Sequence, residues 1–401
     1  MHFDFTSIMD RRGKDALAVD ILGQPGVPGA PKEGFDAIPM WVADMNFATV
    51  PAVINAITAR AQHSAYGYFA PRDEYYDAII QWQKTQNHVT GLARGHIDYA
   101  NGVVGGVGCA LKTVASPGDP VLIHAPTYVG FTHVLEDNGY RAVHSYLQKD
   151  SEGIWRMDLA DMEEKLQSQQ IHVAILCSPH NPCGRVWERW ELEQAMELFR
   201  KYDVYVISDE IWSDLLLFGN RHIPTQSISE DAKMRTMAFY APSKTFNLAG
   251  LVGSYSIIYN ERLRHGYRRE ANRTYFNNMN VLSMHALMGA YSQEGLAWLT
   301  ELRQVLEQNV TFACDYAEKH FPGVKISRPQ GTYMLFADCT QWCAEHGIGL
   351  DALLRRCWDV GVALQDGRGF FGPCHMRINL ALPTARVEEA FRRLKEFVFI
   401  P

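Results

Sequence analysis

The 401-residue sequence predicts an α/β protein with a large domain, built on a mostly parallel central sheet, and a smaller α+β domain. The chain is longer than one small hydrophobic core requires, which favours two domains. Apolar residues make up 47% of the sequence and charged residues 21%, so a packed core is expected. In the middle of the chain, short β-branched runs alternate with amphipathic stretches of helical spacing, an order typical of parallel α/β sheets.

Five short apolar runs predict the buried strands of the large domain. They are VLIHA (121–125), HVAILC (172–177), VYVIS (204–208), TMAFYA (236–241) and SYSIIY (254–259). Between the second and the third of these runs lies RWELEQAMELFRKY (189–202), whose apolar residues recur at helical spacing and predict a helix. We assign residues 48–288 to this domain.

The pattern changes after about residue 290, where long helical stretches predominate. Helices are expected at 296–321, 351–361 and 386–398, and a strand at 331–338. Near the start of the chain, the glycines and prolines of GQPGVPGAPKEG (23–34) favour an irregular surface crossing. We assign residues 1–47 and 289–401 to the smaller α+β domain.

The charge and composition exclude several classes of partner. A net charge of −7 argues against nucleic acid and anionic membranes. No apolar run approaches the length of a membrane span, and the opening MHFDFTSIMDRRGKD has no apolar signal region, so we expect a cytoplasmic protein. Its eight cysteines are expected to be mostly reduced thiols, and without HExxH or paired CxxC motifs no metal site is expected.

Three unusual segments follow predicted strands, where ligands collect in open α/β sheets. They are CSPHNPCG (177–184), SDEIWSD (208–214) and APSKTFNLAG (241–250). A lysine after a strand is most often solvated. Here the hydroxyls of Ser243 and Thr245 can hydrogen-bond, and the apolar residues that follow would desolvate Lys244 and lower its pKa. A neutral amine in this place is suited to forming a Schiff base.

Asp209 lies between a buried strand and the apolar pair Ile211 and Trp212, where an unpaired carboxylate is costly. A protonated pyridine nitrogen would supply the missing cation, and the ion pair would keep the ring an electron sink. Together with Lys244, this favours pyridoxal 5'-phosphate as the cofactor. The alternative for Asp209 is a helix cap or an internal salt bridge.

Three further features fit the same cofactor, each with a structural alternative. Asn181 precedes Pro182, so its side-chain amide can point out of the turn and donate to the phenolic oxygen of the cofactor. The alternative is that this asparagine only forms a simple Asn-Pro turn. The run NGVVGGVG (101–108) enters a predicted helix, and its free amides suit a monophosphate. Tyr128 can lie flat on a planar heterocycle or pack in the core.

Several segments also resemble a known family. SPHNPCG, SDE, SKTFNLAG and the late MRINLALP stand in the order and spacing of fold-type I, aspartate-aminotransferase-like pyridoxal phosphate enzymes. More narrowly, IPMWVADMNF (38–47), YGY (66–68) and PQGTYMLFAD (329–338) resemble the MalY/PatB group of cystathionine and cysteine-conjugate β-lyases. The resemblance covers essentially the whole chain, and it implies the aspartate aminotransferase-like fold and a homodimer whose active site is shared between subunits.

The resemblance implies roles for individual residues. Lys244 is the lysine that bonds to the cofactor, Asp209 the partner of the pyridine nitrogen and Asn181 the donor to the phenolic oxygen. Tyr128 is the ring that stacks on the cofactor. The phosphate is held by Gly106, Val107, Ser243 and, from the neighbouring subunit, Tyr68, with Tyr66 close by.

On the substrate side, Arg377 matches the arginine that binds the α-carboxylate with a planar guanidinium fork, and its alternative is an ordinary salt bridge. The substrate pocket is expected to be shaped by Trp41, Ala43, Asp44 and Tyr333. Two residues depart from the wider family: Val252 replaces a basic residue common in aminotransferases, and Trp212 stands where Tyr or His is frequent. Both departures lean away from a typical aminotransferase.

The predicted function is β-elimination from L-cystathionine or a related cysteine S-conjugate, which releases a thiol, pyruvate and ammonia. Lys244 removes the Cα proton as general base. The main alternative is an aminotransferase, which shares the early steps. A regulatory or interaction protein that kept the fold is disfavoured because Lys244, Asp209 and Arg377 are intact. A nicotinamide oxidoreductase is disfavoured because Ala125 stands where a ribose-binding acid is required.

Overall fold

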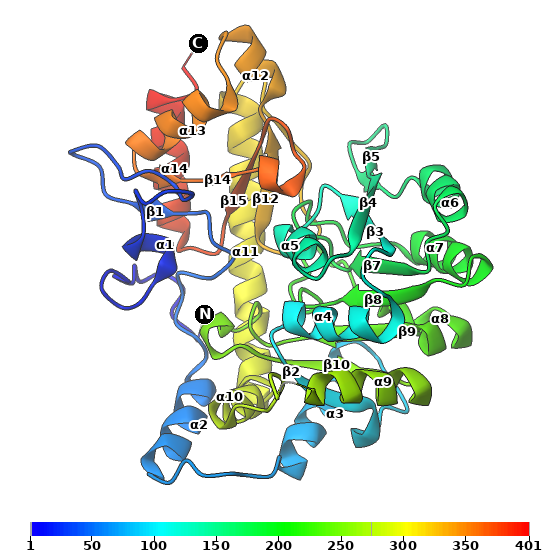
Figure 1. Ribbon diagram of the computed structural model, residues 1–401. Coiled ribbons are helices and arrows are strands. Elements are labelled where there is room, and N and C mark those ends of the chain that lie inside the picture. Colours follow the sequence, from blue (N-terminus) through cyan, green and yellow to red (C-terminus); the bar gives the residue numbers. More distant parts are fainter. Residues whose placement is uncertain (1, 274, 401) are drawn as a thin grey trace. The chain divides into compact units, whose positions relative to one another are not determined.

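The computed structural model describes residues 2–273 and 275–400 (Figure 1). Within these residues the chain forms two units. The larger unit contains residues 49–181 and 185–299, and the smaller contains residues 2–48, 182–184 and 300–400. The smaller unit is therefore assembled from both ends of the chain.

A seven-stranded sheet runs through the larger unit in the order β2-β10-β9-β8-β7-β3-β4 (Figure 1). The strands are β2 (Ile97–Asn101), β3 (Pro120–Ala125), β4 (Arg141–Tyr146), β7 (Val173–Cys177), β8 (Tyr205–Asp209), β9 (Thr236–Tyr240) and β10 (Gly253–Ile257). Neighbours from β4 to β9 pair in parallel, whereas β10 is antiparallel to both β9 and β2. The mostly parallel central sheet is confirmed, and all five predicted strands are present.

Helices cover both faces of this sheet, because alternate residues of its strands point to opposite sides. Met237 and Phe239 pack in a cluster with α4 (Val103–Val114) and α9 (Glu261–Asn272). Ala238 and Tyr240 belong to a second cluster with α3 (Asp73–Gln86) and α10 (Val281–Ala290). Further elements of this unit are α2 (Pro51–Gln62), α5 (Val129–Asp137), α6 (Leu159–Ser168), α7 (Arg189–Lys201), α8 (Glu230–Arg235), β5 (Gln148–Lys149), β6 (Trp155–Arg156), η1 (Arg94–His96), η2 (Thr225–Ser227) and η3 (Ala249–Leu251).

The smaller unit is built on a four-stranded antiparallel sheet of order β11-β12-β15-β14. Its strands are β11 (Lys325–Ile326), β12 (Met334–Asp338), β14 (Gln365–Asp366) and β15 (His375–Asn379). Its helices include α1 (Leu17–Asp20), α11 (Gln293–His320) from residue 300 onward, α12 (Thr340–Glu345), α13 (Leu350–Asp359), α14 (Thr384–Phe397) and η4 (Arg368–Phe370). The parallel pair β1 (Ile38–Pro39) and β13 (Val362–Ala363) joins the two ends of the chain. The predicted helices and strand are confirmed, and residues 23–34 form neither helix nor strand.

Two chain-wide properties bear on the expected class of protein. Within the described residues, no helix combines the length and the apolar character that crossing a bilayer requires. All eight cysteines lie in this part of the chain, and none of them forms a disulfide.

Candidate active site

The three segments singled out in the sequence begin at one edge of the central sheet. Cys177, Asp209 and Phe239 stand opposite one another where β7, β8 and β9 end. Backbone hydrogen bonds tie the segments together just beyond this point, from Ser178 N to the Asp209 carbonyl at 2.9 Å and from Glu210 N to the Phe239 carbonyl at 2.8 Å. Because parallel strands align their carboxyl ends, the fold brings the predicted lysine, aspartate and asparagine segments to one place.

Asp209 is a buried carboxylate, with only 4% of its surface exposed. Its Oδ1 accepts a hydrogen bond from the Ile211 backbone N–H at 3.0 Å. Burial raises the pKa of Asp209 to about 7, although the Ile211 N–H and the nearby Lys244 ammonium both act to lower it. A carboxylate that burial disfavours to this extent would be stabilised by a cationic ligand.

Lys244 is half-buried, and its Nζ lies 5.8 Å from the centre of the buried Trp212 ring. Two overlapping backbone turns contain the lysine and fix its backbone. Phe246 N donates to the Pro242 carbonyl at 2.8 Å, and Leu248 N donates to the Ser243 carbonyl at 2.9 Å. Trp212, which stands where relatives often have Tyr or His, therefore places its indole ring beside the Lys244 amine.

Asn181 and Tyr128 come from the ends of neighbouring strands. Asn181 is buried, four residues past the end of β7. Tyr128 is half-buried just before α5, and its ring meets Phe131 edge to face at 5.4 Å. A Cβ atom at Gly130 would collide with the Tyr128 ring, so a larger residue there would displace it. Nothing in the sequence marked Gly130 as a support for this ring.

The residues of the predicted phosphate loop lie at and just inside the start of a helix. Helix α4 begins at Val103, directly after Gly102 with φ 72°, and the N–H of Gly106 already donates to the Gly102 carbonyl at 3.1 Å. Gly106 and Val107 thus lie one turn inside the helix rather than at its start. The amides that an α-helix leaves without an intrahelical acceptor belong to its first residues, here Val103 and Val104. Ser243, the third phosphate ligand predicted from the same subunit, is half-buried beside Lys244.

A buried polar network stands directly behind Asp209. Glu210 accepts hydrogen bonds from His222 Nε2 and Tyr240 Oη, each at 2.6 Å, and from Ser208 Oγ at 2.8 Å. Burial acts to raise the pKa of Glu210, but the charge of His222 and these hydrogen bonds outweigh it and lower the pKa. Two adjacent carboxylates therefore differ: Glu210 already has its partners, whereas Asp209 is poised for a cation.

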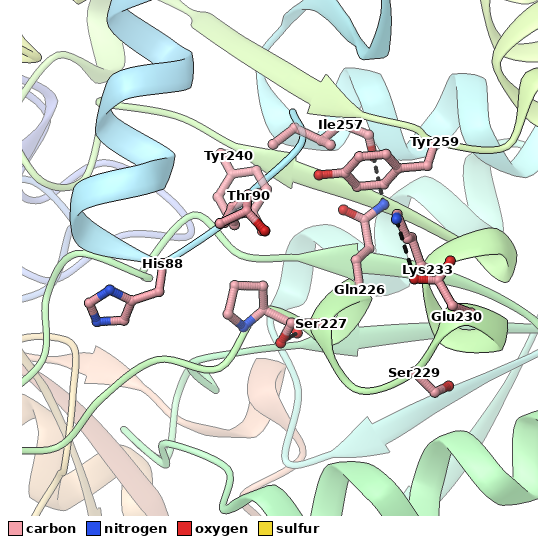
Figure 2. Close-up of a pocket in the computed structure, with 12 residues that line it drawn as sticks. His88, Thr90, Gln226, Ser227, Ser229, Glu230, Lys233, Tyr240, Ile257 and Tyr259 are labelled. Atoms are coloured by element: carbon pink, nitrogen blue, oxygen red, sulfur yellow. Dashed lines mark hydrogen bonds and ion pairs between the residues drawn. The ribbon is translucent and has the colours of Figure 1, made fainter. Parts of the chain in front are cut away.

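A cavity of about 270 Å³ opens on the far side of this network (Figure 2). Tyr240 lines it together with Gln226, Lys233 and Tyr259. Figure 2 shows Lys233 turned toward Glu230, with which it forms an ion pair at 3.4 Å. Among the described residues, the lining of this cavity includes none of the predicted site residues. The chemistry expected from the sequence thus lies elsewhere in the unit.

In the smaller unit, Arg377 is a buried arginine on β15. Its Nη2 donates to the Trp41 carbonyl at 3.0 Å and to the Gln365 side chain. The guanidinium carbon lies 4.4 Å from the centre of the Phe370 ring. Gln365 is placed there because β14 pairs with β15 and sets it directly opposite Arg377. Gln365 and Phe370 could not be predicted from the sequence, since only this register and the turn after β14 bring them to the arginine.

The residues predicted to shape the substrate pocket also lie in the smaller unit. Trp41 is buried, and its indole N–H donates to the Ala18 carbonyl at 2.9 Å. Asp44 forms an ion pair with Arg11 at 2.5 Å. Tyr333 is fully buried, which raises the pKa of its hydroxyl well above the ordinary value, and Ala43 is half-buried.

Tyr68 lies on an exposed segment without helix or strand between α2 and α3 (Figure 1). Tyr66 is anchored there: its hydroxyl donates to the Ala61 carbonyl at 2.8 Å, and the Arg60 guanidinium lies 5.0 Å from its ring centre. Tyr68 is fully exposed in this chain. Of the two tyrosines, Tyr68 is the one available to another molecule.

Comparison with known proteins agrees with this geometry. The family model for aminotransferase class I and II matches residues 37–394. Cystathionine beta-lyase PatB of Bacillus subtilis is 34% identical over 364 residues, covering 90% of this chain and 92% of PatB. Protein MalY of Escherichia coli is 31% identical over 398 residues, covering 96% of each chain.

A solved structure supports the same conclusion about the fold. The PLP-bound C-S lyase of Staphylococcus hominis matches with a TM-score of 0.89 and 29% identity, covering 100% of this chain and 99% of that one. The predicted aspartate aminotransferase-like fold is thereby confirmed. In sequence and in fold, the chain belongs to the aminotransferase class I and II family, together with PatB and MalY.

Proposed function

We propose that this protein is a pyridoxal 5'-phosphate-dependent carbon–sulfur β-lyase that cleaves L-cystathionine or related cysteine S-conjugates. The observation that carries the proposal is that Asp209 and Lys244 follow neighbouring strands at one sheet edge, where burial raises the pKa of Asp209 to about 7. Such a carboxylate suits the protonated nitrogen of a pyridine ring. The relationship to the cystathionine beta-lyase PatB and to the C-S lyase of Staphylococcus hominis supports C–S cleavage as the reaction.

The residues of the larger unit fit the cofactor. Lys244 would bond to it covalently, Asp209 would hold its pyridine N–H, and Asn181 would donate to its phenolic oxygen. Tyr128 would pack on the ring. The phosphate would be bound by the amides of Val103 and Val104 at the start of α4, by Ser243, and by Tyr68 of a neighbouring subunit. When bound, pyridoxal phosphate supplies an electron sink that stabilises negative charge at the substrate Cα.

This chain's own residues would then move one proton. The Lys244 amine would remove the proton from the substrate Cα as general base. Trp212 would border the Lys244 amine on one side, since the Lys244 Nζ lies 5.8 Å from the centre of its ring. Loss of the thiolate from Cβ follows, and with one water the conjugate becomes a thiol, pyruvate and ammonia.

Arg377 would bind the substrate α-carboxylate. The Arg377 guanidinium lies against the Phe370 ring and donates a hydrogen bond to Gln365, so the fork is oriented before substrate arrives. We expect Arg377→Lys to lower kcat/KM by about tenfold to a hundredfold, mainly through KM, because an ammonium cannot bind a carboxylate in the same bidentate manner. Steady-state kinetics measure this. Arg328→Lys, on the surface of the same unit, is the matched control, and equal KM values for both variants would contradict the assignment.

We also propose a homodimer in which Tyr68 contributes to the partner's site. Its full exposure supports this, because it leaves the hydroxyl available to another subunit. The eight cysteines without disulfides suit a reducing cytoplasmic setting.

Tyr68→Phe should weaken cofactor binding, and Lys244→Ala should be inactive. Mixed and reassociated, the two variants should regain about a quarter of wild-type activity, since half of the dimers would carry one intact site. No recovery at limiting cofactor, with subunit exchange verified by mass, would contradict a shared site.

The direct test is to incubate the purified protein with pyridoxal phosphate and L-cystathionine or an S-alkyl cysteine, without any 2-oxo acid. Equal amounts of pyruvate and thiol would establish β-elimination. Absence of both products, with amino transfer once a 2-oxo acid is added, would show an aminotransferase instead. Comparing several S-conjugates then identifies the substituent that the protein prefers.

A further inference from the structure

A buried hydrogen bond joins the segment that carries Asp209 to the segment that carries Lys244. The Thr245 hydroxyl donates to Oδ2 of Asp214 at 3.0 Å, and the indole N–H of Trp82 in α3 donates to Oδ1 of the same carboxylate at 3.0 Å. Asp214 is 3% exposed and Thr245 is 0% exposed. A carboxylate in such a place is stable only when hydrogen bonds replace its lost hydration, so both donors are needed.

Aromatic rings surround this bond and hold both donors. Trp82 stacks on Tyr291 with ring centres 4.5 Å apart and an interplanar angle of 3°. Phe246, the residue after Thr245, stacks on Trp298 at 5.6 Å and meets the Trp82 ring at 5.9 Å. The packed rings of Trp82 and Phe246 therefore restrict the movement of Thr245 away from Asp214.

The stretch between Asp209 and Asp214 is itself rigid. Ser213 N donates to the Glu210 carbonyl at 3.0 Å, and Leu215 N donates to the Trp212 carbonyl at 2.9 Å, so two consecutive turns close it. Trp212 in the middle of this stretch faces the Lys244 amine. One short segment thus contacts the lysine segment at two points, through the Trp212 ring and through the Asp214 carboxylate.

We propose that Asp214 and Thr245 are positioning residues for the reaction, whose hydrogen bond sets the place of the Lys244 amine relative to Asp209. This inference rests on the proposed function, in which Asp209 and Lys244 act on opposite ends of one rigid ring. A shift of either end would misalign the amine with the proton that it must remove. Proton transfer is sensitive to such shifts, because a displacement of about 1 Å can cost two orders of magnitude in rate.

The test compares Thr245→Val, which removes the hydroxyl but keeps the shape, with Thr245→Ser, which keeps the hydroxyl. Thr245→Val should lower kcat for β-elimination about tenfold while KM stays within about twofold, because neither Thr245 nor Asp214 is proposed to contact the substrate. It should also slow the bonding of added pyridoxal phosphate to the apoprotein and shift the pH midpoint of the cofactor's visible absorbance. Thr245→Ser should restore all three quantities. Should Thr245→Val fail to fold, Thr245→Ala serves in its place.

Thr384→Val is the control for a lost threonine hydrogen bond, because the Thr384 hydroxyl donates to Asn309 Oδ1 at 2.8 Å in the smaller unit. It should lower thermal stability and leave kcat and the absorbance midpoint unchanged. If Thr245→Val behaves in the same way as this control, the hydrogen bond is only structural and the inference fails. If the wild-type protein cleaves no conjugate, the proposed function fails, while the absorbance midpoint, which needs only the cofactor, still tests the positioning role.

Discussion

Replacing Lys244 with alanine is expected to lower turnover by about three orders of magnitude or more, because the variant loses both the covalent bond to the cofactor and the general base. Added pyridoxal phosphate would still be bound by the remaining residues of the site. Borohydride reduction followed by mass spectrometry should therefore show the cofactor attached to the wild-type chain and absent from the variant. Pyruvate formation from an S-conjugate measures the loss of turnover.

Lys233→Ala is the matched control for this experiment. Lys233 belongs to the same unit, but it pairs with Glu230 and lines the cavity in Figure 2 rather than the sheet edge of Lys244. It should retain wild-type turnover and cofactor attachment. A Lys244→Ala enzyme that keeps more than about a tenth of wild-type turnover would contradict the role of general base, since that role contributes at least two orders of magnitude.

Asp209→Asn is expected to lower kcat by about two to three orders of magnitude, comparable with the loss of a preorganised charge in other active sites. An amide can accept a hydrogen bond from a pyridine N–H but cannot stabilise its positive charge. The cofactor should bind more weakly, and equilibrium dialysis with pyridoxal phosphate measures this loss of affinity. Asp203→Asn provides the control, because Asp203 stands exposed just before β8 and pairs only loosely with Arg235 at 3.7 Å.

The same substitution should change how stability depends on pH in the cofactor-free protein. Burial raises the pKa of Asp209 from the ordinary 3.8 to about 7, so between these values the folded protein holds a proton that the unfolded chain has released. This contribution to stability is therefore full below about pH 4 and is lost as the pH rises toward 7, by up to about 4 kcal/mol. Asp209→Asn should lack this contribution. The difference in free energy of unfolding between the two apoproteins, measured at pH 5 and pH 8, tests it, and a difference that does not vary with pH would contradict the burial argument.

Much of the candidate site could be predicted from sequence because its parts follow strands. Asp209, Asn181 and Lys244 each stand within a few residues of a clear β-branched run, and parallel pairing brings the ends of such runs together. The start of α4 could not be predicted in the same way, because its glycines conceal where the helix begins, and that start decides which amides are open.

Contacts between distant parts of the chain left no local signal. Gln365 meets Arg377 through a strand register, and Phe370 meets it through the turn that follows. In the sequence Asp214 is only one more polar residue after a strand, because its contacts with Trp82 of α3 and with Thr245 form only in the folded chain. Side chains of this kind depend on tertiary packing, which periodicity and motif spacing do not encode.

The make-up of the smaller unit has a consequence for synthesis on the ribosome. Residues 49–181 and 185–299 make up the larger unit, so almost all of the residues proposed to bind the cofactor are translated before residues 300–400 of the smaller unit. The N-terminal residues must wait longer, because Ile38 pairs with Val362 and Trp41 meets Arg377 only when the end of the chain appears. A nascent chain could thus capture its cofactor before the arginine that receives the substrate exists.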